Sequence, residues 1–221
     1  MLNKDDEKVR GHSPPVLDKS TLALIWGGAS TLSAGIGVWL AIRMFNPKAF
    51  GNNFSNISIV GVLGFAFCMA LPVAIAQWIV FPKISRLISL PIKNTWIWLL
   101  ITIIGLMAII LPCLSVPLET FFYLPFMLFI PVIIPVIPGA ILLGILQWMY
   151  LNSQFKAGPA WTWVLITVVG AGSGGVISGL LLWLTGFRLS IEVSWGMTVV
   201  LGISSLQGMM MLDFKEKIAP L

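Results

Sequence analysis

Apolar residues gather in six long runs along this chain, and polar and charged residues collect in the short stretches between them. About 20 consecutive apolar residues cross the hydrocarbon core of a bilayer as a helix, and each run approaches or exceeds that length. The pattern therefore predicts an all-α, polytopic membrane bundle with about six transmembrane helices. We place the helices at Thr21–Ile42, Ser58–Val80, Thr95–Cys113, Phe129–Leu151, Ala160–Thr185 and Leu189–Leu212.

The entry to the fourth helix is the least regular part of the pattern. Pro125, Pro131, Pro135 and Pro138 interrupt a continuous apolar run, and each proline removes a backbone donor and kinks a helix. Three arrangements of residues 114–138 are compatible with this pattern. The segment lies along the membrane interface, re-enters the membrane, or forms part of a long fourth helix.

Two parts of the chain repeat one phrase. Gln77-Trp78 and Gln147-Trp148 end the second and fourth runs, and a Trp-x-Trp pair opens the run that follows each of them. A repeat on this scale indicates duplicated helical units, so we expect three pseudo-repeated hairpins. Gln207 ends the sixth run at about the same depth, although no tryptophan follows it.

The three glutamines Gln77, Gln147 and Gln207 are the candidate polar site. A primary amide in lipid needs partners, and a hydrogen bond between helices there contributes roughly 0.6 to 2 kcal/mol. In one interpretation the amides bond to neighbouring helices or to each other and fix the bundle. In the other they form a collar around a cavity that opens to the cytoplasm.

Small residues recur every fourth position on the first and fifth helices. Close backbone approach through such residues drives much of the association between helices in lipid. The pattern predicts helix-packing seams at Ala29, Ser33, Gly37 and Ala41, and at Ala171, Gly175 and Gly179.

Composition leaves no room for a soluble domain. Hydrophobic residues make up 58% of the chain and charged residues 10%, whereas a soluble domain carries about 25% charged residues. Residues 1–20 mix both charge signs without an apolar core, so they read as a disordered tail rather than a signal peptide. Residues 21–212 form the transmembrane domain, and residues 213–221 form a second short tail.

The charges predict how the bundle is oriented. Of the 13 lysines and arginines, ten fall on the side of the two tails, which places both termini in the cytoplasm. The net charge of +5 is explained by this bias, so no nucleic-acid partner is expected. Six tryptophans fall at the same end and predict an interfacial aromatic belt: Trp78, Trp96, Trp98, Trp148, Trp161 and Trp163.

Catalytic chemistry finds no support in the sequence. Ser173 lies in a segment similar to the nucleophile segment of rhomboid proteases, but such a serine needs a base, and the single histidine, His12, lies in the tail. No metal-ligand cluster and no ionisable residue in mid-span is found, which argues against a metal site and against ion-coupled transport. We expect no catalytic residue, no cofactor and no metal.

The Gln-Trp end, the basic turn and the Trp-x-Trp opening resemble a phrase found in a loose group of uncharacterised multi-pass bacterial membrane proteins, cyanobacterial ones in particular. The similarity covers Gly61–Gly105 and Gly139–Gly179. This resemblance implies a bacterial inner (plasma) or thylakoid membrane as the setting, and it implies no activity.

Two functions are compatible with these features. The first is a non-catalytic assembly, scaffold or accessory subunit, with membrane lipid and other membrane protein subunits as partners. The second is a passive carrier or channel for a small neutral solute or lipid, which would use the glutamine collar.

Overall fold

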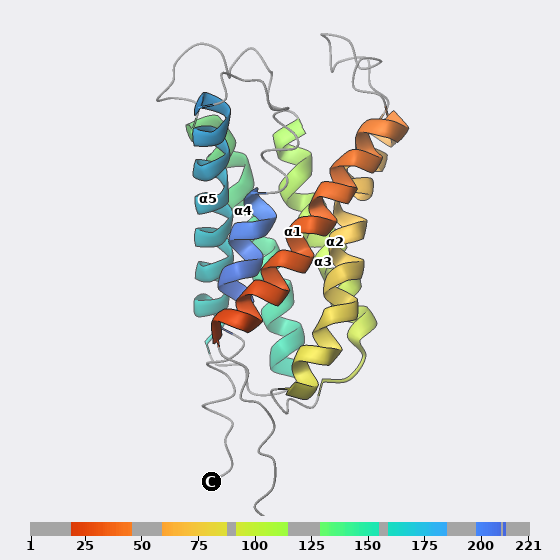
Figure 1. Ribbon diagram of the computed structural model, residues 1–221, viewed down its shortest axis with the longest axis vertical. Helices are drawn as coiled ribbons and strands as arrows, with labels where there is room; N and C mark the ends of the chain where they lie inside the picture. The colour runs from red at the N-terminus through yellow and green to blue at the C-terminus, as the bar shows by residue number, and fades with distance from the viewer. Residues whose placement is uncertain are drawn as a thin grey trace, which may run out of the picture.

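A computed structural model describes residues 19–45, 59–87, 92–114, 129–154, 159–184, 198–208 and 210 (Figure 1). All regular structure in these ranges is helical, so the expected all-α bundle is confirmed. The long helices are α1 (Lys19–Phe45), α2 (Ile59–Leu87), α3 (Thr95–Leu114), α4 (Phe129–Gln154) and α5 (Ala160–Leu184). A short apolar helix, Thr198–Gly208, follows them.

Five of these helices are long and apolar enough to cross a membrane, which makes the protein membrane-embedded. Their bounds lie within a few residues of the expected ones, except that α2 continues to Leu87. Of the expected sixth span the structure describes residues 198–208 and 210. The two predicted tails lie outside the described residues, apart from Lys19 and Ser20, which already belong to α1.

Successive long helices pack against one another, from α1 against α2 through to α4 against α5. The Thr198–Gly208 helix, drawn in blue in Figure 1, lies among them and is mostly buried. It contacts α1 through Ser205, α2 through Ser204 and α4 through Gln207. The short helix therefore connects α1 and α2 with α4.

Glycines make the closest helix contacts. A Cβ on Gly37 of α1 would lie 2.6 Å from the Met69 carbonyl oxygen of α2, and a Cβ on Gly170 of α5 would lie 2.7 Å from the Gly202 oxygen. Such distances leave no room for a side chain, so backbone packs directly on backbone at these seams.

The predicted packing residues divide into buried and partly exposed positions. On α1, Gly37 and Ala41 are buried, whereas Ala29 and Ser33 are only partly buried, and the Ser33 hydroxyl donates to the carbonyl of Ala29 in its own helix. On α5, Ala171 and Gly175 are buried.

Two clusters fill the interior. One is aliphatic and draws on α1 to α5 and the short helix. The other is aromatic and contains Trp26, Phe81, Trp98, Tyr150 and Trp163. The helices that carry them contain internal prolines, Pro72 and Pro82 in α2 and Pro112 in α3. A bundle in lipid tolerates these because neighbouring helices satisfy the freed backbone groups.

The proline-rich entry to α4 is helical from Phe129, so Pro131, Pro135 and Pro138 all lie within the helix. Their spacing of four and three residues puts them on one face, which confines the missing backbone donors to that face. The sequence allows three arrangements of residues 114–138: along the interface, re-entrant, or part of a long fourth helix. Residues 129–138 belong to α4, and residues 115–128 lie outside the described residues.

Candidate functional site

The candidate site is built around Gln77, which is buried in the second half of α2. Its Oε1 accepts hydrogen bonds from Trp98 Nε1 at 3.2 Å and from Thr102 Oγ1 at 3.4 Å, both on α3. Its Nε2 donates to Ser30 Oγ of α1 at 3.2 Å and to Ser204 Oγ of the short helix at 3.3 Å. An amide has two acceptor and two donor positions, and all four are used here.

A second set of bonds surrounds Gln147 on α4. Its Oε1 accepts from Trp163 Nε1 of α5 at 3.2 Å and from Gln207 Nε2 at 2.6 Å. Gln207 Nε2 also donates to Thr167 Oγ1 at 3.1 Å. Two of the three predicted glutamines thus bond directly, and Gln77 is joined to them through the helix that carries Ser204 and Gln207.

Both sets are made by the same sequence phrase. Trp98 and Thr102 are four residues apart on α3, as Trp163 and Thr167 are on α5. Residues at this spacing lie on one face of a helix, and each tryptophan donates to the glutamine of the preceding helix. The threonines differ, because Thr102 donates to Gln77, whereas Thr167 accepts from Gln207.

The indole groups fix which way each amide points. An indole N–H can only donate, so the oxygens of Gln77 and Gln147 must face Trp98 and Trp163. Gln207 then has to offer its nitrogen to Gln147, which turns its own oxygen away. That Oε1 is buried and has no hydrogen-bond partner among the described residues, and neither has the buried Nε1 of Trp26.

The structure separates the six predicted belt tryptophans. Trp78, Trp96 and Trp161 are exposed, and Trp148 is half-buried. Trp98 and Trp163 are 0% and 1% exposed, so these two lie inside the bundle and not on its surface. Their N–H groups are needed inside the bundle by the glutamine amides, and this outweighs the preference of tryptophan for the headgroup region.

Aromatic rings surround the first glutamine. Phe81 stacks on Trp98 with a centroid separation of 4.4 Å, and Trp26 meets both rings at 5.7 and 6.1 Å. The rings keep the amide in an apolar setting, where hydrogen bonds are stronger electrostatically than in water.

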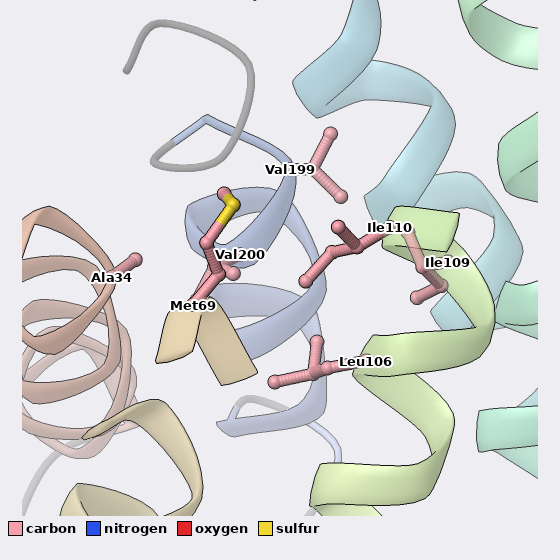
Figure 2. Close-up of a pocket in the computed structure, with 7 residues that line it drawn as sticks. All are labelled: Ala34, Met69, Leu106, Ile109, Ile110, Val199 and Val200. Atoms are coloured by element: carbon pink, nitrogen blue, oxygen red, sulfur yellow. The ribbon is translucent and has the colours of Figure 1, made fainter. Parts of the chain in front are cut away.

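A small cavity lies in the aliphatic half of the bundle, away from the glutamines. Figure 2 shows Met69, Leu106, Ile110 and Val200 converging on it from α2, α3 and the short helix. Its free volume is about 20 Å³, roughly the room that one water molecule needs. Its walls are apolar, so it offers nothing for a polar solute to bind.

Four polar residues of the site were not among the predicted ones: Ser30, Thr102, Thr167 and Ser204. The sequence could have indicated Thr102 and Thr167, because each lies in the repeated phrase four residues after a tryptophan. Ser30 and Ser204 are far from Gln77 in sequence and lie in no repeated phrase, so only folding brings them to it.

The arrangement offers hydrogen-bond donors and acceptors from amides, indoles and hydroxyls, and no charged residue of the described ranges takes part in it. The charged residues of the described ranges are Lys19, Arg43, Lys83, Arg86 and Lys93, all near helix ends or in a turn. Within these ranges no group of three His, Cys, Asp or Glu residues could hold a metal ion. Cys68 is a free cysteine.

Comparison of the chain with protein-family models, with curated proteins and with solved structures found no match. The site is therefore interpreted from its own geometry.

Proposed function

We propose that this protein is a non-catalytic subunit that assists the assembly or stability of a membrane complex. The observation that carries the proposal is the internal use of the glutamine amides. Gln77 forms hydrogen bonds to α1, α3 and the short helix with all four of its donor and acceptor positions. Amides that are consumed in this way hold helices together and are not free to bind a passing solute.

Two outward-facing glycines support a partner. A Cβ on Gly28 of α1 or on Gly172 of α5 would meet nothing within 4 Å. Glycine weakens a helix relative to alanine, and at these two positions a Cβ would touch none of the described residues. Close approach by a helix of another subunit would use them.

Purification from native membranes in mild detergent tests the proposal. We expect the wild-type chain to be isolated with a partner at fixed stoichiometry. The double variant Gly28→Leu/Gly172→Leu should keep its thermal midpoint, because both sites are open, and should lose that partner. Isolation of the wild-type chain alone, with unchanged behaviour of the variant, would contradict the proposal.

A passive carrier is the second candidate, and one observation favours it. The unpartnered Oε1 of Gln207 and Nε1 of Trp26 are a buried acceptor and a buried donor, such as a small neutral solute with both groups would satisfy. In liposomes this function requires a solute flux that Gln207→Leu abolishes in protein that still folds. Absence of flux through the wild-type protein would rule it out.

A further inference from the structure

The turn between α2 and α3 carries three cationic side chains that all face outward. Lys83 and Arg86 lie in the last turns of α2, and Lys93 precedes α3. None of the described residues is an aspartate or glutamate, and the sequence has none between Lys19 and Leu118. Within the described part of the protein these cations have no ion-pair partner.

The backbone of this turn is held in place from α4. Lys93 N donates to Gln154 Oε1 at 2.9 Å, and the Lys93 carbonyl accepts from the Tyr150 hydroxyl at 2.6 Å. Asn94 follows with a φ of 54°, a conformation that asparagine tolerates better than most residues. Two side chains of α4 therefore fix the backbone at Lys93, while the Lys93 side chain is exposed.

The surroundings of the turn are those of a membrane surface. Trp78 and Trp96 are 41% and 56% exposed, and the Trp78 N–H donates to Thr95 Oγ1 at 3.2 Å, which ties α2 to the start of α3. Exposed tryptophans settle at headgroup level. Lys83 lies five residues beyond Trp78, or about 7.5 Å along a helix, which places its ammonium group among the headgroups.

We propose that this turn binds the headgroup of an anionic phospholipid. Lys83, Arg86 and Lys93 supply the positive charge, and Tyr150 and Gln154 position Lys93. The binding is that of a membrane lipid rather than of free phosphate, because apolar side chains continue directly below the turn. Ile79 and Leu100 are 49% and 44% exposed and offer a surface to the acyl chains.

Native mass spectrometry of the detergent-purified protein tests this site, with phosphatidylglycerol and phosphatidylcholine as the titrated lipids. We expect the wild-type protein to retain phosphatidylglycerol preferentially. Each basic residue near a membrane surface changes affinity by about fivefold, so Lys83→Gln/Arg86→Gln/Lys93→Gln should weaken phosphatidylglycerol binding by about 100-fold. Phosphatidylcholine binding should not change.

Arg43→Gln is the matched control. Arg43 is exposed too, but it lies far from the three cations. Ser30 marks the level of Gln77, to which it is bonded, and Arg43 lies 13 residues after Ser30 on α1, about 20 Å further along the helix and near the opposite end of the bundle. Equal weakening by Arg43→Gln would show a general charge effect and overturn the proposal. Equal affinity for both lipids would do the same, as would displacement of bound lipid by millimolar glycerol phosphate.

Tyr150→Phe tests whether the fixed position of Lys93 contributes to lipid binding separately from the charge of the three cations. It removes one hydroxyl that holds the Lys93 carbonyl and leaves all three cations in place. We expect several-fold weaker phosphatidylglycerol binding with the preference for phosphatidylglycerol retained. Unchanged affinity in this variant would show that the fixed turn plays no part, and unchanged affinity in the triple variant would remove the site altogether.

Discussion

Two buried tryptophans near Gln77, Trp26 and Trp98, play different roles. Trp26 and Trp98 are both fully buried and belong to one aromatic cluster. The N–H of Trp98 donates to Gln77, whereas that of Trp26 has no acceptor within the part of the chain that the structure describes. Removing one partner of a buried hydrogen bond leaves the other unsatisfied, at a cost of about 1–3 kcal/mol.

Trp98→Phe should therefore destabilise the protein more than Trp26→Phe. Both changes remove similar ring volume, so the difference between them, about 1–2 kcal/mol, reports the hydrogen bond. Thermal midpoints or reversible unfolding in mild detergent measure it. Equal midpoints would mean that Trp98 contributes only packing.

The pair Gln147 and Gln207 should behave as one unit. Gln147→Leu removes the acceptor of Trp163 Nε1 and one of the two acceptors of Gln207 Nε2, which keeps Thr167 Oγ1. Gln207→Leu removes the same bond to Gln147 from the other side. Residues in one hydrogen-bond network couple by 0.5–3 kcal/mol. We expect the double variant to be more stable than the sum of the single losses predicts, by about 1 kcal/mol. Strict additivity would contradict the 2.6 Å bond between them.

At the scale of the helices, α5 presents glycines to two different environments. Gly170 packs against Gly202 and Ile203 of the short helix, and a Cβ there would lie 2.7 Å from the Ile203 Cα. Gly172, two residues on, has open space around it. The same helix thus offers a test and its control.

Gly170→Ala should lower the unfolding midpoint, because the new methyl group forces two backbones apart at a cost of about 1–3 kcal/mol. Gly172→Ala should leave the midpoint unchanged or raise it, since alanine favours helix by up to about 1 kcal/mol over glycine. Both are measured in the same detergent. A loss of stability confined to Gly172→Ala would show that α5 packs through the face of Gly172 and not through that of Gly170.

The helices themselves were predictable, because length and apolarity decide them locally. The bounds of α3 and the starts of α4 and α5 were predicted to within one residue. The course of α2 beyond Val80 was not, because its last turns carry Pro82, Lys83 and Arg86, which read as loop. In the structure Phe81 and Ile84 bury themselves in the aromatic cluster, and that packing extends the helix.

The partners of the glutamines depended on the whole molecule. Sequence spacing could indicate that Gln77 and Gln147 need hydrogen bonds, and the repeated phrase contained Trp98, Thr102, Trp163 and Thr167. The sequence could not show that the Thr198–Gly208 helix packs among the other helices. The position of the Thr198–Gly208 helix brings Ser204 to Gln77 and Gln207 to Gln147, and such long-range pairing follows only from assembly of all the helices.

Orientation in the membrane is the prediction that concerns the whole molecule. The bias of lysine and arginine toward the side of Lys83, Arg86 and Lys93 places that side, with the glutamine network, at the cytoplasmic face. The test uses single cysteines in a chain whose Cys68 and Cys113 are replaced by alanine. One replaces Asn52, between α1 and α2 in sequence, and the other replaces Ser153, in the last turn of α4; the charge bias predicts that these positions lie on opposite sides of the membrane. An impermeant thiol reagent added to intact cells should label Asn52→Cys and spare Ser153→Cys until the membrane is opened. Labelling of Ser153→Cys in intact cells would reverse the orientation and would move the proposed lipid site to the outer leaflet.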